Sequence, residues 1–261
     1  VINVLNALRS GCDIVSGRSI VRNESIWSRL FYWYHSFHVI FGFIRKSHAP
    51  GNNEATRTKV FNSVTYPPIS RGDDFYFSLL ALMNGIKFCY RDDAVIKVSM
   101  PRTFREVASW QSARMKGVVE GALIAGLKFP IDFPLWSLFA LSPGIIVLLV
   151  YFMLVLNYPL TAVPLILLGS YIALLVYLVV KVGLASKKCI EDPSLLDGIL
   201  ALAGMYIHAL FTLIYGVKYM IKLSLRKNEI LIKAGKVLHK FNFPSSTIKL
   251  RLSDIVRKFI R

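Results

Sequence analysis

The sequence is poor in charged residues. Only 18% of its 261 residues are Asp, Glu, Lys or Arg, whereas soluble domains average about a quarter, and the mean hydropathy is +0.51. This composition excludes a disordered chain, a fibrous repeat and an ordinary cytosolic enzyme. Acidic residues are scarcer than basic ones: there are 15 Asp or Glu and 32 Lys or Arg, which gives a formal net charge of +17. Such a balance suits nucleic acid, anionic lipid or a phosphorylated substrate, and the apolar excess favours lipid.

Cysteine is also scarce. The chain has three, at positions 12, 89 and 189, and an odd number without metal-ligand spacing indicates neither a disulfide framework nor a zinc site. We therefore expect Cys12, Cys89 and Cys189 to be reduced and buried. The sequence begins at Val1 and shows no signal-peptide pattern, so we expect it to be a fragment of a longer protein.

The apolar excess is concentrated in one region. Residues 133–180 contain no charged side chain, and these 48 positions exceed twice the roughly 20 residues that one membrane span needs. Asn157 and Pro159 divide this run, and His208 interrupts a third apolar run. The alternative, a buried helical hairpin of a soluble protein, is disfavoured by the length of the uncharged run. The predicted membrane spans are residues 136–156, 162–180 and 198–217.

Residues 1–132 differ from this region, because they carry 17 basic and 10 acidic side chains. Their mixed periodicities predict a soluble α/β part that leads directly into the membrane. The aromatic-rich helix within it would lie against either the protein or the bilayer surface. The predicted elements are a buried strand over 13–17 that ends at Gly17, the aromatic-rich helix over 25–45, a helix that Asn84-Gly85 closes, strands over 86–90 and 94–98, and a helix over about 103–127.

Gly72-Asp73-Asp74 is the first candidate site. A carboxylate at a strand-to-helix turn, with a glycine before it, is exposed and accepts backbone hydrogen bonds, which suits a general base. The same pattern is typical of a helix N-cap that interacts with the helix dipole. Spacing alone leaves both interpretations open.

Two further patterns carry polar side chains. Gln111 and Arg114 are three residues apart and so share one helix face, where the planar guanidinium group can bind phosphate oxygens. A solvated face of an amphipathic helix is the alternative. Gly51-Asn52-Asn53 forms a turn in which backbone and amide groups can approach a ligand closely, and a plain loop is the alternative there.

The order of these motifs is more specific than any one of them. Over about residues 12–120 it resembles the C-terminal half of the catalytic domain of membrane-bound family 2 glycosyltransferases, which have the GT-A fold. The motifs that carry the resemblance are Gly51-Asn52-Asn53, Gly72-Asp73-Asp74, Gly85-Ile86-Lys87-Phe88 and Gln111-Ser112-Ala113-Arg114-Met115-Lys116-Gly117, followed by hydrophobic runs.

The resemblance predicts the domain organisation. We expect an α/β fold class, with a partial GT-A-like catalytic domain and its interfacial helix over residues 1–128. An all-α transmembrane region over 129–217 and a basic tail over 218–261 would follow. This tail holds 12 Lys or Arg against Glu229 and Asp254. It is either a solvated, partly disordered arm or a segment attracted to anionic lipid.

The resemblance also implies roles for single residues. Asp74, with Asp73 beside it, would be the catalytic base. Gln111 and Arg114 would bind the donor diphosphate. Met115 stands where polymerising members have a Trp that stacks on the acceptor sugar, which disfavours a processive synthase. The residues assigned to acceptor binding are Gly51, Asn52, Asn53 and Met115.

The family's divalent metal, Mg or Mn, has no predicted ligand in this chain. Its Asp-x-Asp belongs to a nucleotide-binding first half that these 261 residues do not include, and Asp92-Asp93 follows the predicted base instead of preceding it. We therefore expect the metal as a cofactor that is held outside this chain. The alternative function is a catalytically inactive, truncated relative that acts as a binding partner or scaffold.

The predicted activity is inverting transfer of a sugar from a nucleotide-sugar to a lipid-linked or membrane-proximal saccharide acceptor. Membrane lipid is a further partner, and the apolar spans argue against nucleic acid. We expect a multi-pass integral membrane protein with a cytosolic catalytic part, because sugar nucleotides are made there and the segment before the first span is basic. If residues 198–217 cross, the basic tail lies outside, against the positive-inside rule; their length nevertheless favours crossing.

Overall fold

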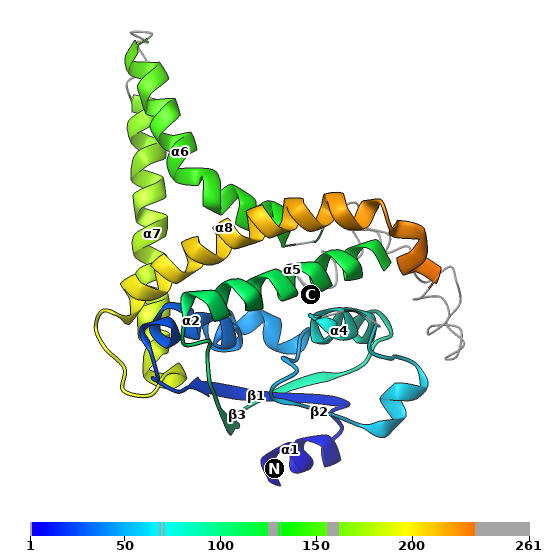
Figure 1. The fold of residues 1–261 in the computed structure, drawn as a ribbon. Helices are drawn as coiled ribbons and strands as arrows, with labels where there is room; N and C mark the ends of the chain where they lie inside the picture. Colours follow the sequence, from blue (N-terminus) through cyan, green and yellow to red (C-terminus); the bar gives the residue numbers. More distant parts are fainter. Residues whose placement is uncertain are drawn as a thin grey trace.

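The structure is a computed structural model that describes residues 2–67, 69, 71–124, 130, 132–155 and 162–232. It has an α/β part around a small sheet, followed by three long apolar helices (Figure 1), as the sequence predicts. The elements are α1 (Ile2–Arg9), β1 (Ile14–Val21), α2 (Ile26–His35), α3 (Phe37–Ile40), η1 (Gly42–Lys46), β2 (Glu54–Thr56), η2 (Thr58–Asn62), α4 (Asp73–Met83), β3 (Phe88–Val98), α5 (Phe104–Ile124), α6 (Phe133–Val155), α7 (Ala162–Cys189) and α8 (Asp197–Ser224).

The sheet has the strand order β2-β1-β3. The central strand β1 is antiparallel to β2 and parallel to β3. Helices α2, α4 and α5 lie on one side of the sheet and α1 lies on the other, while α8 lies on the outer side of α5 (Figure 1). The α/β part is therefore layered, and α8 covers it on the side from which α6 and α7 project.

The prediction that Gly17 ends a strand is wrong, because Gly17 lies in the middle of β1. The β1–β3 register jumps at this point, from Gly17 opposite Arg91 to Arg18 opposite Val95. The two strands predicted around residues 91–93 are therefore one strand with an irregularity. A Cβ atom on Gly17 would lie 2.0 Å from the carbonyl oxygen of Ala94, so glycine permits this close approach.

The aromatic-rich segment lies against the protein. It divides into α2, α3 and the 3-10 helix η1, and Phe31, Tyr32 and Trp33 of α2 are fully buried. The Tyr32 hydroxyl donates a hydrogen bond of 2.8 Å to the carbonyl of Val182 in α7, and the ring of Trp33 lies 5.4 Å from that of Trp136 in α6. These contacts join the α/β part to the base of the apolar helices.

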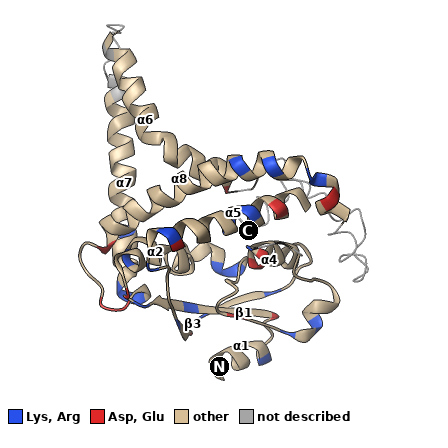
Figure 2. Ribbon diagram, in the orientation of Figure 1, with Lys and Arg blue, Asp and Glu red and all other residues tan. Residues whose placement is uncertain are grey.

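All three apolar helices are long and hydrophobic enough to cross a membrane, which fits a membrane protein. The α6–α7 hairpin projects away from the α/β part, and its projecting portion carries no charged residue (Figures 1 and 2). Helix α7 continues beyond the predicted end at residue 180 and reaches Cys189. Lys181 ends the uncharged run, but a lysine does not end a helix. Its last turns bury Val182, Ala185 and Cys189 against the α/β part. The predicted turn at residues 157–159 lies outside the described residues.

Helix α8 is longer than the predicted span over 198–217, because it continues to Ser224 and takes in part of the basic tail. It runs alongside α5 and across α2, at a wide angle to the projecting hairpin (Figure 1). The tail beyond residue 232 lies outside the described residues.

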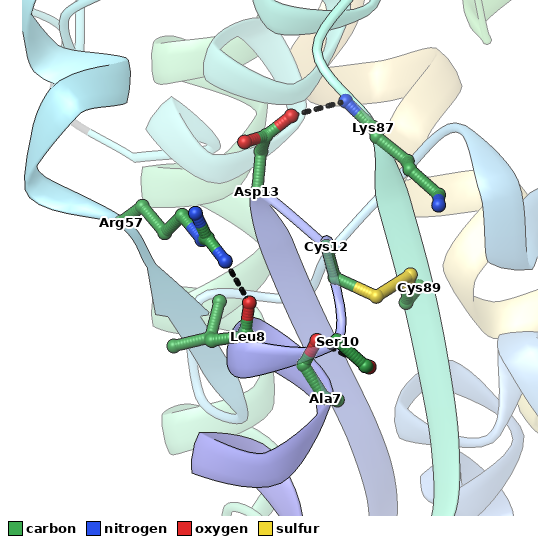
Figure 3. The surroundings of a disulfide bond; sticks show 8 residues. All are labelled: Ala7, Leu8, Ser10, Cys12, Asp13, Arg57, Lys87 and Cys89. Atoms are coloured by element: carbon green, nitrogen blue, oxygen red, sulfur yellow. Dashed lines mark hydrogen bonds between the residues drawn. A yellow bond between two sulfur atoms is a disulfide. The ribbon is translucent and has the colours of Figure 1, made fainter.

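The prediction of three reduced cysteines is wrong for two of them. Cys12 and Cys89 form a disulfide (Figure 3). Cys189 is free and buried, as expected. Cys12 precedes β1, and Cys89 pairs with Val15 across the β1–β3 ladder, so parallel pairing brings together residues 77 positions apart. Disulfides persist in oxidising compartments and are rare in the cytosol. The bond thus argues against the predicted cytosolic location of the α/β part, which stays a prediction.

Candidate functional site

The first turn of α4 presents Asp74 to the loop that begins at Gly51. Gly72 is the N-cap, with a left-handed φ of 75°, so the prediction that Asp73 or Asp74 caps the helix is wrong. Both aspartates lie in the first helical turn, where the helix dipole favours negative charge. The Asp74 carboxylate accepts hydrogen bonds from the backbone N–H groups of Gly51 (3.0 Å) and Phe75 (2.9 Å). Asp73 is exposed.

The predicted acceptor loop divides into two roles. The Asn53 side-chain amide donates to the carbonyls of Arg18 and Ala94, at 3.1 Å each, so Asn53 holds the loop onto the irregular β1–β3 pair. The Asn52 amide instead lies 3.0 Å from Nδ1 of His35, at the end of α2. Gly51 and Asn52 therefore connect Asp74 with His35.

The sequence interpretation did not include His35. Burial lowers the pKa of this imidazole to about 4, although the nearby Asp74 opposes the shift. The ring is therefore neutral at pH 7. With Nδ1 accepting from the Asn52 amide, its proton resides on Nε2, which makes His35 a hydrogen-bond donor.

A cleft of about 400 Å³ lies beside this group. It has an aromatic face from Trp110, a cation from Arg71 and an imidazole from His35, and its remaining lining residues are Ser99, Met100 and Pro101. Arg71 directly precedes the Gly72-Asp73-Asp74 turn, and Trp110 directly precedes Gln111. Their positions next to two singled-out motifs were the only signals in the sequence that could have identified them.

Two glycines of α5 allow the residue before the aspartate turn and the Tyr76 ring of α4 to approach this helix closely. A Cβ atom on Gly117 would lie 1.9 Å from the carbonyl oxygen of Arg71, and one on Gly121 would lie 2.1 Å from the ring of Tyr76. The Tyr76 hydroxyl also donates to the carbonyl of Val118 (2.9 Å). This close packing fixes the Arg71–Asp74 turn against α5, so the aspartate turn and the Gln111–Arg114 face belong to one rigid arrangement.

Arg114 is buried and already paired within the protein. Its guanidinium group forms an ion pair with Asp132, approaches the Thr212 hydroxyl at 3.5 Å, and lies 5.9 Å from the centre of the Tyr34 ring. The Tyr34 ring in turn contacts the rings of Trp110 and His35, at 4.8 and 5.5 Å. Arg114 is therefore separated from the cleft by one aromatic ring.

Gln111 and Met115 face α8. The Gln111 amide donates to Nδ1 of His208 (2.9 Å), and Met115 is fully buried in a cluster that contains Leu223 and Val119. The structure thus connects Asp74, through Gly51 and Asn52, to His35 of the cleft. It places Gln111, Arg114 and Met115 at the α5–α8 contact. The predicted ligand roles of these residues stay predictions.

Within the part of the chain that the structure describes, no three His, Cys, Asp or Glu side chains are grouped as metal ligands would be. The divalent metal implied by the resemblance also stays a prediction. No protein-family model and no curated protein sequence matches this chain, so the proposal below rests on residues and geometry.

Proposed function

We propose that this chain is the C-terminal part of a membrane-bound glycosyltransferase. The enzyme would transfer a sugar from a nucleotide-sugar to a lipid-linked or membrane-proximal acceptor, with inversion at the anomeric carbon. One observation carries the proposal: Asp74 is linked through Gly51 and Asn52 to His35, one of the residues that line the cleft. Arg71, just before the aspartate turn, and Trp110 of α5 line the same cleft, and α5 lies directly beneath the apolar helix α8.

Asp74 has the surroundings of a general base. Two backbone N–H groups orient its carboxylate, and the N-terminus of α4 stabilises its charge. In the transfer, Asp74 takes the proton of the acceptor hydroxyl while the hydroxyl oxygen attacks the anomeric carbon. The bond from that carbon to the diphosphate oxygen breaks, and the diphosphate leaves with the bonding electrons. A carboxylate is a weak base, so this role requires hydrogen-bond reach to the hydroxyl.

The cleft supplies three recognition groups. The exposed Arg71 offers a planar donor pair for phosphate oxygens. Trp110 offers an aromatic face on which a sugar ring can stack, and the neutral His35 offers an N–H donor to a hydroxyl. A divalent metal held outside this chain would neutralise charge on the leaving diphosphate.

The test compares Asp74→Asn with Asp73→Asn in the complete protein that carries these residues. Asp73 is the matched control because it is exposed in the same helical turn. We expect Asp74→Asn to abolish transfer of radiolabelled sugar to membrane lipid at unchanged expression, and Asp73→Asn to retain most activity. Wild-type turnover by Asp74→Asn would refute the proposal.

A catalytically inactive binding partner is the second candidate. The observation that favours it is that Gln111 and Arg114 are already bonded to His208 and Asp132. Titration of the complete protein with a nucleoside diphosphate separates the two functions. The enzyme should bind it, with Arg114→Ala losing more affinity than Gln111→Ala, because charge-assisted bonds to phosphate are about twice as strong as neutral ones. Absence of binding by the wild-type protein would favour the second candidate.

A further inference from the structure

Helix α8 contacts the α/β part along nearly its whole length. Near its start, Asp197 pairs with Arg29 of α2 at 2.5 Å. Near its end, the Tyr219 hydroxyl lies 2.9 Å from that of Ser112 in α5. These contacts are 22 residues apart, which is about 33 Å of helix at 1.5 Å per residue. A helix that crosses a bilayer of about 30 Å cannot contact a domain outside that bilayer over such a length.

The contacts between these two ends are equally close. A Cβ atom on Gly204 would lie 1.7 Å from the carbonyl oxygen of Leu30, so the two backbones touch. His208 bonds to Gln111, and Thr212 lies beside the guanidinium group of Arg114. Gly204, His208 and Thr212, which interrupt the apolar run, therefore lie on the face that packs on the α/β part. They are not polar groups placed in hydrocarbon.

The opposite face of α8 is apolar and exposed. Ile199, Leu210, Ile214 and Ile221 are 57, 48, 59 and 63% exposed, respectively, at intervals that place them along one side of the helix. A continuous apolar stripe of this kind requires a nonpolar partner. Within the described residues nothing covers it, and α8 is the outermost layer on this side (Figure 1).

The projecting hairpin identifies the partner. The uncharged part of α6–α7 extends on the side to which the outer face of α8 is turned (Figures 1 and 2). A bilayer that surrounds the hairpin therefore has its near surface at the outer face of α8. Charge agrees with this position, because Lys218, Lys222, Arg226 and Lys227 gather at the C-terminal end of α8, where anionic headgroups attract basic side chains (Figure 2).

We propose that α8 lies in the plane of the membrane interface, with its outer face in lipid and its inner face on α2 and α5. Only α6 and α7 then enter the hydrocarbon as a crossing hairpin, and the chain after α8 is on the same side as the α/β part. This arrangement differs from the third span predicted from hydropathy. It also removes the conflict between a crossing third helix and the position of the basic tail.

The first test asks on which side residue 245 lies. Native cysteines do not interfere, because Cys12 and Cys89 are bonded and Cys189 is buried. Single substitutions Asn62→Cys in the α/β part, Asn157→Cys and Ser245→Cys are treated with an impermeant maleimide on intact and on lysed cells. We expect residues 62 and 245 to react under the same condition and residue 157 under the other. Reaction of residue 245 together with residue 157 would overturn the proposal.

The second test measures depth. A fluorophore is attached at Ile199→Cys, Leu210→Cys or Ile221→Cys in separate samples of the complete protein. Each is reconstituted in phosphatidylcholine–phosphatidylglycerol vesicles that carry nitroxide lipids of known depth. An in-plane helix predicts the same shallow depth at all three positions. A depth near the bilayer centre at residue 210 with shallow ends would show a crossing helix, and the absence of lipid quenching would show that another protein covers the stripe. Either outcome would overturn the proposal.

Discussion

The α6–α7 hairpin and α8 are both long apolar helical segments, yet the glycines in the projecting part of the hairpin and those of α8 have opposite surroundings. A Cβ atom on Gly144 of α6 or Gly169 of α7 would meet no atom within 4 Å. A Cβ atom on Gly198 or Gly204 of α8 would lie 2.3 or 1.7 Å from a backbone oxygen. Hydropathy indicates only that a segment avoids water. The surroundings of its glycines show whether another part of the protein packs closely against it or leaves it open to lipid.

Polar residues show the same difference. In α8, Asp197, His208 and Thr212 all have partners in α2 or α5. In the hairpin, the Ser142 hydroxyl of α6 lies 3.0 Å from the Tyr171 hydroxyl of α7, which also bonds the Tyr206 hydroxyl of α8. These hydroxyl groups of the hairpin therefore need no hydrogen-bond partner from the α/β part, whereas the polar groups of α8 do.

Alanine should have opposite effects at two helical glycines. In Gly204→Ala, the new methyl group collides with the Leu30 backbone, and we expect a loss of more than about 4 kcal/mol or failure to fold. In Gly169→Ala, the methyl group meets open space, and the higher helix propensity should stabilise by up to about 1 kcal/mol. Denaturant unfolding in detergent micelles, followed by tryptophan fluorescence, measures both. Equal effects would contradict the close α2–α8 contact.

The buried carboxylate at the start of α8 should be nearly as sensitive. Asp197 is fully buried and pairs with Arg29. Asp197→Ala leaves a partly buried guanidinium without its partner, so we expect a loss of about 3 kcal/mol. The control is Glu229→Ala, which removes an exposed pair with Arg226 and should cost at most about 1 kcal/mol. The same unfolding assay measures both variants. Similar losses of stability would show that the Asp197–Arg29 pair does not hold α8 to α2.

The disulfide should stabilise the sheet, on the far side of the α/β part from the hairpin. Cys89→Ser removes a link between residues 77 positions apart, and we expect a loss of about 2 to 4 kcal/mol. A reductant should lower the stability of the wild-type protein and leave the variant unchanged. Maleimide–polyethylene glycol labelling of denatured protein, before and after reduction, counts the bonded thiols. Three reactive thiols without reductant would show that the bond is not formed in the cell.

Acid should weaken the α/β part and leave the hairpin helical. Burial lowers the pKa of His38 to about 4, with the adjacent His48 as a further cause. The unfolded chain, with a histidine pKa near 6.5, takes up the proton first. Stability is therefore complete above about pH 6.5 and falls as the pH drops towards 4. We expect His38 to contribute about 2 kcal/mol of the loss at pH 5.

The control for this acid effect is His38→Asn, which should show a smaller stability difference between pH 7 and pH 5. Residues 133–180 contain no ionisable Asp, Glu, Lys, Arg or His, so far-ultraviolet circular dichroism should retain the hairpin helices at pH 5. An unchanged pH dependence in His38→Asn would assign the acid sensitivity to other groups.

Part of the candidate site could be predicted because its signals are local. Gly72 and the aspartates after it mark a helix start, and Asn84-Gly85 marks the end of the same helix, where Gly85 has a φ of 71°. The cleft could not be predicted in this way. His35, Arg71 and Trp110 come from three separate segments, and each alone reads as an ordinary surface or core residue.

The partners of the side chains on α5 could not be predicted from the sequence either. Spacing places Gln111 and Arg114 on one helix face, which is correct, since both face the α8 side. It does not reveal which element meets that face. His208 and Asp132, the partners that bond these two side chains, lie 97 and 18 residues further along the chain.

The apolar helices and their order after an α/β part follow from local sequence patterns, because hydropathy and helix stop signals act over a few neighbouring residues. Tertiary structure alone decided the Cys12–Cys89 bond, the place of Gly17 within β1, the membership of the cleft and the surface on which α8 lies. Each of these depends on which distant segments meet. Contacts of that kind follow from packing and strand pairing across the whole fold, and no local pattern contains them.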